Sequence, residues 1–439
     1  MTGGPRAFPV GRLGPWLAAI GLAALLAPSL LASERFPPPE FDNHHLPVTA
    51  TPAPRAGVLD HVDVLVLAAC LGLAAYLALK RRSRRELAAL AIFSIVYFGF
   101  WRRGCICPVG SLQNVSLAFS DGSYAIPATV LAFFLLPLVF ALFFGRVFCA
   151  AVCPLGMAQD VVALRPLAIP RWIERALRLF AFAYLGLAVL FVATGAGFVV
   201  CRYDPFVGFY RRTGSLEMIL AGVIILLIGV FIARPYCRFL CPYGVLLGWF
   251  SRLAWRHAAI TPAECIRCRL CEESCPFGAI NAPAEWSGLA RGAGKRGLAV
   301  TLALVPLLAA GGAWAGSRLA LPLSRCHATV QLAESVWKEN AGEVREPSVA
   351  GEAFRATGRP VDQLYREALD VRHRFAVGSA LFGAFMGLAL GAQLVAASVR
   401  RRRADYEPDR TLCLSCGRCF LSCPIERERL KKLKAPGAA

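Results

Sequence analysis

Long apolar segments constrain this chain more than any other feature. A helix needs about 20 residues to cross the ~30 Å hydrocarbon core of a bilayer. Only 17% of the 439 residues are charged, against roughly 25% in soluble proteins. We therefore predict an α-helical polytopic membrane protein with about eight transmembrane helices. The predicted segments are 14–32, 58–79, 87–101, 126–144, 179–200, 216–233, 298–317 and 374–397.

The distribution of basic residues predicts the orientation in the membrane. One basic run, 80–85, follows the second segment, and another, 400–403, follows the eighth. With the N-terminus inside, the cytoplasmic connections carry about twice as many Lys and Arg residues as the outer ones, in agreement with the positive-inside rule. We expect a multi-pass protein of the bacterial inner membrane with both termini in the cytoplasm. The net charge of +20 then reflects topology, and no nucleic-acid partner is predicted.

The segments and the cysteine motifs between them predict the domain organisation. Segments four and six each run into a C-x3-C-P-x-G motif, at 149–156 and 237–244, while segments three and five end in cysteines at the outer face. Two hairpins of the same sense imply an internal repeat about an axis along the membrane normal. The predicted domains are a signal anchor with a short periplasmic segment (1–57), a transmembrane core (58–257), the first ferredoxin half (258–297), a transmembrane hairpin with a periplasmic loop at 318–373 (298–397) and the second ferredoxin half (398–439).

The strongest chemical motif is C-x2-C-x2-C-x3-C-P, which occurs twice. In bacterial ferredoxins three cysteines of such a run bind one cluster, and the fourth binds the other cluster. Zinc ribbons are the alternative, but they use paired C-x2-C elements and do not need the third cysteine and the proline. We predict a small cytoplasmic α+β domain with two [4Fe–4S] clusters, split by the transmembrane hairpin. The ligands would be Cys265, Cys268, Cys271 and Cys423 for cluster 1, and Cys413, Cys416, Cys419 and Cys275 for cluster 2.

The two C-x3-C-P motifs predict a third cluster. If a helix persists through each motif, cysteines four residues apart share one face, the proline then stops the helix and the glycine permits a turn. Two such helix ends would face each other with four thiolates, a soft site that suits an iron–sulfur cluster. The alternative is buried free thiols. Nearby arginines would offset the thiolate charge, or would only follow the positive-inside rule. The cysteines are Cys149, Cys153, Cys237 and Cys241, and the arginines are Arg146, Arg234 and Arg238.

The outer cysteines predict a fourth cluster, with Cys105, Cys107, Cys201 and Cys326 as its ligands. Disulfides are a serious alternative, because an oxidising periplasm favours them. Cys105 and Cys107 are too close in sequence to pair with each other comfortably. Cys70 lies alone in the middle of segment two, and we interpret it as a packing residue.

The two C-x3-C-P motifs, together with the ferredoxin runs, resemble the membrane polyferredoxins of the NapH/NosR type. The resemblance covers about residues 87–275 and the last run at 413–424. It implies that the twelve cysteines of clusters 1 to 3 are ligands. Such proteins serve periplasmic nitrate and nitrous-oxide respiration, and a copper-reducing assembly factor of the haem–copper oxidases shares the motif. Three features depart from the family: 33–57 has no room for the outer flavin domain of NosR-like proteins, the ferredoxin halves are split, and the outer cysteines are additional.

These features predict a membrane-bound iron–sulfur electron-transfer protein. It would sit in membrane lipid and pass electrons between the quinol pool and a redox partner protein, either a periplasmic reductase or cytochrome or a cytoplasmic carrier. The alternatives are an assembly factor that reduces or delivers metal to a respiratory complex, and a membrane redox sensor. Whether the chain is itself an enzyme, as an oxidoreductase component, stays open. No catalytic residue is predicted, although Asp204, beside Tyr203, is the residue to test in quinol oxidation.

Overall fold

The computed structural model is almost entirely helical. It describes residues 56–104, 108–164, 166–167, 169–198, 201, 203–211, 215–260, 265–284, 290–344, 347–399 and 403–434. Two parts of the chain discussed above lie outside this description. They are segment 14–32 with the linker that follows it up to residue 55, and the pair Cys105 and Cys107. The elements of the membrane part are α2 (Gly57–Ala75), η1 (Tyr76–Arg81), α3 (Arg84–Ser94), η2 (Ile95–Trp101), α4 (Pro108–Ser120), α5 (Ala128–Phe144), η3 (Phe148–Val152), α6 (Pro154–Val162), α7 (Arg171–Ala193), α9 (Pro205–Arg211), α10 (Leu216–Phe231), α11 (Pro235–Phe239), α12 (Pro242–Arg252), α14 (Ala290–Arg318) and α18 (Val361–Ser398).

Four of the described helices are long and apolar enough to cross a membrane: Gly57–Arg81, Arg171–Ala193, Arg296–Arg318 and Val361–Ser398. They correspond to four of the predicted segments. The apolar helices α5 and α10 are shorter, with 17 and 16 residues, and segment 87–101 forms most of α3 and all of η2. The chain is therefore a membrane protein, while the full set of eight spans, the hairpin repeat and the orientation stay predictions.

Helix α7 begins eight residues before the predicted segment. Its first turns are charged, and hydropathy alone does not mark them as part of a helix. Glu174 in the first turn is buried and pairs with Arg238, which follows Cys237, at 3.0 Å. A buried ion pair therefore anchors the first turn of this helix, which apolar periodicity does not predict.

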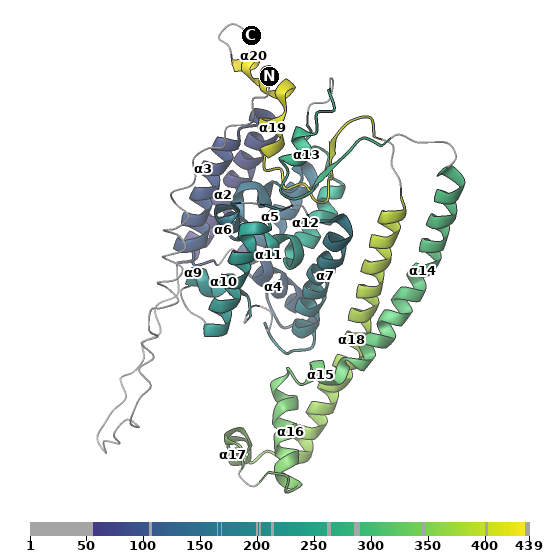
Figure 1. Cartoon of the computed structure of the whole chain (residues 1–439). Coiled ribbons are helices and arrows are strands. Elements are labelled where there is room, and N and C mark those ends of the chain that lie inside the picture. Colours follow the sequence, from purple (N-terminus) through teal and green to yellow (C-terminus); the bar gives the residue numbers. More distant parts are fainter. Residues whose placement is uncertain are drawn as a thin grey trace. The chain divides into compact units, whose positions relative to one another are not determined.

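The core of the membrane part surrounds the first C-x3-C-P motif. Buried Leu67 and Leu71 of α2, Phe98 of η2 and Phe148 of η3 belong to one apolar cluster that also contains Cys149 and Cys153. Figure 1 shows the short elements α6 and α11 among the longer helices. The motif thus lies within a buried apolar core.

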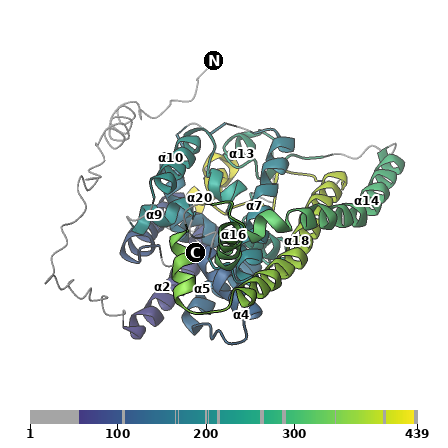
Figure 2. The same cartoon turned by 90° about the horizontal axis from the view of Figure 1, so that it is seen from below.

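Helices α14 and α18 form a tight antiparallel pair. Gly312 of α14 packs so closely on Gly383 of α18 that an added Cβ would overlap a backbone carbonyl, and Gly316 is equally close to α18. Small residues allow this backbone approach between helices in lipid. Figures 1 and 2 show α18 beside α14, and α18 also packs against α7.

The stretch predicted as a periplasmic loop is largely helical. It contains α15 (Ala320–Ser324), α16 (Ala328–Asn340), α17 (Val349–Ala356) and the first turns of α18. Buried Val336, Phe354 and Leu364 form its own small apolar core. The apolar positions are amphipathic rather than continuous, so a search for membrane segments does not find these helices.

The two ferredoxin halves meet although the α14–α18 pair separates them in sequence. Strand β1 (Ile280–Asn281) pairs antiparallel with β2 (Glu407–Pro408), and Ala284 pairs with Arg403. The short helices α13 (Leu270–Glu273) and α19 (Arg418–Ser422) are in contact, and α20 (Pro424–Lys434) follows α19. This small sheet with flanking helices agrees with the expected α+β ferredoxin-like unit.

Candidate metal centres

The four cysteines of the C-x3-C-P motifs line one enclosed site. Cys149 lies in η3 and Cys237 in α11, whereas Cys153 and Cys241 directly precede α6 and α12. All four line a single small cavity with a volume of ≈ 20 Å³. In the thiolate form, Cys241 would interact electrostatically with each of the other three cysteines. We refer to these four thiols as the inner set.

The helix does not persist through either motif, so the prediction of cysteines one turn apart on a continuous helix was wrong. Cys153 and Cys241 have extended ψ values of 113° and 111°. The following prolines are the first residues of new helices, where a missing N–H costs nothing. Each second cysteine therefore occupies the N-cap position of a helix, and Cys241 Sγ accepts a hydrogen bond from Gly244 N at 3.3 Å. Helix N-termini favour negative charge, which suits a thiolate ligand.

The glycines of the motifs make room for arginines, and do not form turns as predicted. A Cβ at Gly156 would lie 3.2 Å from Arg234 Nη1, and a Cβ at Gly244 would lie 3.2 Å from Arg146 Nη2. Each arginine stands three residues before the first cysteine of one motif and reaches the glycine of the other. The guanidinium groups thus cross between the motifs and place two positive charges beside the inner set.

Arg234 is the most constrained of these side chains. It is fully buried, has a positive φ of 51°, and forms a two-armed ion pair with Asp160, at 2.8 Å from Nε and 2.6 Å from Nη2. It also donates a hydrogen bond to the carbonyl of Cys149 at 2.5 Å. A strained backbone persists only where its surroundings hold it, and here the ion pair and the hydrogen bond do so.

Further polar groups reach the sulfur atoms directly. Gln159 Nε2 donates to Cys237 Sγ at 3.3 Å, while its Oε1 accepts from Tyr236 N at 3.0 Å. Arg146 Nη2 lies 3.8 Å from Cys149 Sγ. Gln159 and Asp160 were missed from the sequence. The sequence contained one signal for them: they are polar residues close after an apolar C-P-x-G motif, and polar groups that become buried need partners.

The inner set fits an iron–sulfur cluster. Arg146 Nε is buried without a hydrogen-bond partner in the described part of the chain, and cluster sulfides accept such hydrogen bonds. Within the described residues, no three His, Cys, Asp or Glu side chains converge closely enough to hold a single metal ion.

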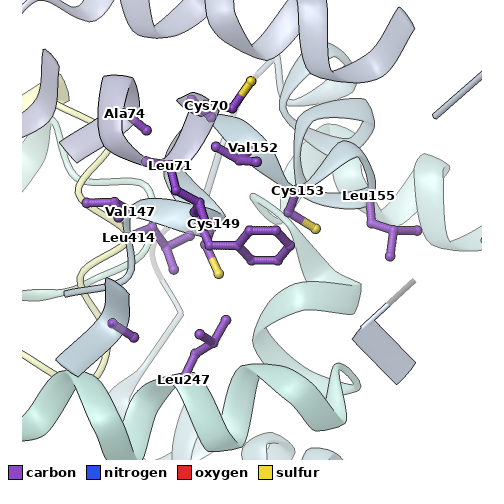
Figure 3. Close-up of a cluster of buried hydrophobic side chains, with 14 of the residues drawn as sticks. Cys70, Leu71, Ala74, Val147, Cys149, Val152, Cys153, Leu155, Leu247 and Leu414 are labelled. Carbon is purple, nitrogen blue, oxygen red and sulfur yellow. The ribbon is translucent and has the colours of Figure 1, made fainter. Parts of the chain in front are cut away.

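Cys70 is not part of this site. It is buried in the same apolar cluster, but Figure 3 shows its thiol pointing away from those of Cys149 and Cys153. Its interpretation as a packing residue agrees with this placement.

The cysteines predicted for cluster 1 range from buried Cys271 to exposed Cys268. Cys271 interacts electrostatically with Cys265 and Cys268. Cys423, from the other half, packs on the same small apolar cluster as Cys265 and Cys271. Cys268 is exposed. The structure therefore brings these four cysteines into one region, with one thiol open to a partner.

The cysteines predicted for cluster 2 also gather. Cys419 interacts with Cys413, Cys416 and Cys275, and in addition with Cys271 of the first group. Burial raises the pKa of Cys413 to about 12 and that of Cys271 to about 11. Such thiols stay protonated at neutral pH, so metal binding would have to displace their protons.

The cluster 2 cysteines lie between the other two groups. Cys275, Cys413 and Cys416 pack on the apolar cluster that holds Cys149 and Cys153. Arg146 donates to the carbonyl of Thr411 at 3.1 Å, and Arg84 donates to the carbonyl of Cys416 at 3.2 Å. The three groups of thiols thus form a row from the exposed Cys268 to the buried inner set.

The outer set is described only in part, because Cys105 and Cys107 lie outside the described residues. Cys201 donates from Sγ to Gln113 Oε1 at 2.6 Å, and Cys326 is exposed in the turn between α15 and α16. The fourth cluster and the alternative disulfides stay predictions.

Asp204 lies deeper than the sequence suggested. It is fully buried, and its carboxylate accepts hydrogen bonds from Tyr236 Oη at 2.7 Å and from Phe206 N at 2.9 Å. Helix α9, which follows it, places Tyr210 Oη 2.8 Å from the carbonyl of Pro154. An enclosed carboxylate cannot meet a quinol directly, so this placement argues against the suggested role. It also shows that the chain after Cys201 folds back to the C-P motifs.

These features define a class of protein: a membrane protein with groups of cysteines that are candidate iron–sulfur ligands. Two family models described as 4Fe-4S binding domains match residues 126–179 with 215–260, and residues 258–281. The methylamine utilization ferredoxin-type protein MauN of Paracoccus denitrificans is 31% identical over 219 residues, which are 45% of this chain and 76% of MauN. The chain belongs to the NapH/NosR-type family of membrane polyferredoxins.

Other relatives match over smaller parts of their length. YccM of Escherichia coli is 26% identical over 187 residues, 38% of this chain and 52% of YccM. The regulatory protein NosR of Pseudomonas aeruginosa is 28% identical over 246 residues, 52% of this chain and 34% of NosR. The chain thus spans about half the length of YccM and about a third of NosR. No solved structure matches it. These relatives support an electron-transfer or regulatory role at the membrane.

Proposed function

We propose that this chain conducts electrons between the membrane quinol pool and a redox partner protein through at least three [4Fe–4S] clusters. The observation that carries the proposal is the row of three thiol groups, from exposed Cys268 through Cys413 and Cys416 to the inner set around Cys153. Adjacent groups share apolar packing, so no partner protein would be needed to bridge them. The exposed end would dock a soluble carrier on the cytoplasmic side.

The chain's own residues would tune each step. Burial penalises the negative charge that a cluster gains on reduction, and nearby positive charge and hydrogen bonds to sulfur offset that penalty. Arg146 and Arg234 supply positive charge at the inner set, and Gln159 supplies a hydrogen bond. The [4Fe–4S] groups themselves would supply one-electron chemistry. The protein would hold them at fixed spacing and exclude water.

Quinol as the donor can be tested on the purified protein. Under strict exclusion of oxygen, we expect a short-chain quinol to bleach the cluster absorbance and to produce the EPR signal of reduced clusters. The control is reduction of the same protein by dithionite, a reagent that reduces accessible clusters and needs no specific binding site. Reduction by dithionite together with complete inertness towards both ubiquinol and menaquinol would overturn the quinol proposal.

A regulatory or assembly role is the second candidate, because one group of relatives is named regulatory protein NosR. Deletion of the gene distinguishes the two functions. Loss of one reductase activity, with that enzyme's metal centre intact, supports the electron conduit. An enzyme that lacks its metal supports an assembly factor, and altered transcription with active enzyme supports a sensor.

A further inference from the structure

A second cavity lies between the membrane helices and the ferredoxin-like unit. It has a volume of ≈ 890 Å³ and is bounded by α2 with η1, by α5, by the segment 255–259 and by Phe420 of α19. Small-molecule sites in proteins typically have volumes of about 300–1,000 Å³. The cavity is therefore large enough for an aromatic headgroup and the first part of an apolar tail.

The wall of this cavity is amphipathic. Its helical part is apolar, with Ala75, Leu79, Phe140 and Phe144, and the other end carries Lys80, Arg256 and His257. Because α2 and η1 together make one of the candidate spans, the apolar part faces the depth at which lipid tails lie. A ligand with a polar aromatic head and an apolar tail matches both ends.

One wall of the cavity belongs to the cluster 2 region. Phe420 follows Cys419 in sequence and is almost fully buried at 1% exposure. Arg82 stacks on its ring, with 4.8 Å between the guanidinium carbon and the ring centroid, and forms a buried ion pair with Glu426 at 2.6 Å. The charge of Arg82 is thus already compensated by Glu426. A bound electron donor would lie next to a cysteine assigned to a cluster.

We propose that this cavity binds the headgroup of a membrane quinol and passes its electrons to cluster 2. This inference rests on the proposed function and locates its donor site. Oxidation of one quinol to quinone breaks two O–H bonds and releases two protons and two electrons. The electrons would leave one at a time, and a [4Fe–4S] cluster held by the cluster 2 cysteines would accept them as a one-electron carrier. His257, half-buried at the cavity wall, accepts the protons in turn and releases them to water.

Gly72 offers a direct test, because it lines the cavity and a Cβ there would meet no atom within 4 Å. Gly72→Phe is designed to place a ring at the apolar end, from a position where an added Cβ meets no atom, and phenylalanine is a better helix former than glycine. Gly311→Phe is the matched control, since Gly311 lies in the spanning helix α14, has the same open surroundings and does not line the cavity. We expect Gly72→Phe to slow quinol-driven cluster reduction at least tenfold, with unchanged dithionite-reduced EPR spectra, and Gly311→Phe to behave as wild type.

A second variant tests the proton acceptor. His257→Gln keeps the size of the side chain but cannot take up a proton, and general bases contribute about 10²–10⁴-fold to such steps. We expect a fall in the maximal rate of quinol oxidation with little change in the quinol concentration for half-saturation.

The outcomes separate the two proposals. If quinol fails to reduce the wild-type protein, the proposed function is wrong. If quinol reduces the wild type and Gly72→Phe equally fast, only the location is wrong. Loss of co-purified anionic phospholipid from Gly72→Phe, with an unchanged quinol rate, would identify a lipid site and overturn the inference.

Discussion

Replacement of Cys153 by serine is expected to remove the inner cluster while leaving the ferredoxin pair in place. Four thiols from two motifs hold this site, and a hydroxyl is a poor ligand for iron in a thiolate cluster. We expect the variant to lose about four of its irons, or about a third of a three-cluster total, together with one EPR signal. Iron and acid-labile sulfide assays on anaerobically purified protein give the count.

Cys70→Ser is the matched control for this experiment. Cys70 is buried in the same apolar cluster as Cys153, but its thiol points away from the site (Figure 3). The control should keep the wild-type iron content and EPR spectrum. Equal iron content in Cys153→Ser and Cys70→Ser would show that the inner set holds no cluster.

Replacement of Asp160 by asparagine is expected to destabilise the protein by about 3–5 kcal/mol, because it leaves the fully buried Arg234 without its counter-charge. Arg84 and Arg418 also face this carboxylate, at 3.6 Å and 3.9 Å. The loss should appear as a lower unfolding midpoint in detergent. Asp362→Asn removes an exposed pair with Arg366 and should cost less than about 1 kcal/mol. Similar losses in both variants would contradict the structural role of Asp160.

The pH dependence of this pair follows from its charges. Burial alone would raise the pKa of Asp160, but the charge and hydrogen bonds of Arg234, together with the charges of Arg418 and Arg84, outweigh burial and lower the pKa to about 2. A depressed carboxyl pKa stabilises the fold above the unfolded pKa of about 3.9. The contribution of Asp160 is therefore present at neutral pH and is lost as the pH falls from about 4 towards 2.

Hydropathy and cysteine spacing predicted much of this architecture. Four predicted segments match helices long enough to span a membrane, because a continuous apolar run has few alternatives to a spanning helix. The repeated ferredoxin motif predicted that Cys265 and Cys423 would lie near each other, and the structure places them on the same apolar cluster. This long-range contact was predictable because a four-ligand site needs cysteines from both ferredoxin runs.

Other features depend on side-chain partners that spacing does not specify. The break at Cys153 and Cys241 was missed, because a proline that ends one helix and a proline that begins the next look alike in sequence. The crossing of Arg146 to Gly244, and of Arg234 to Gly156, requires the two motifs to be placed in three dimensions. The cavity beside Phe420 likewise combines parts of the chain that lie far apart in sequence.

Metal analysis of the intact protein, purified without oxygen, tests the central claim most directly. Three thiol groups that each hold a [4Fe–4S] cluster require at least about twelve irons and as many sulfides per chain, and reduction should produce EPR signals from interacting clusters. A protein with about eight irons would have only the ferredoxin pair, and a colourless protein with zinc as its metal would contradict the electron-transfer account entirely.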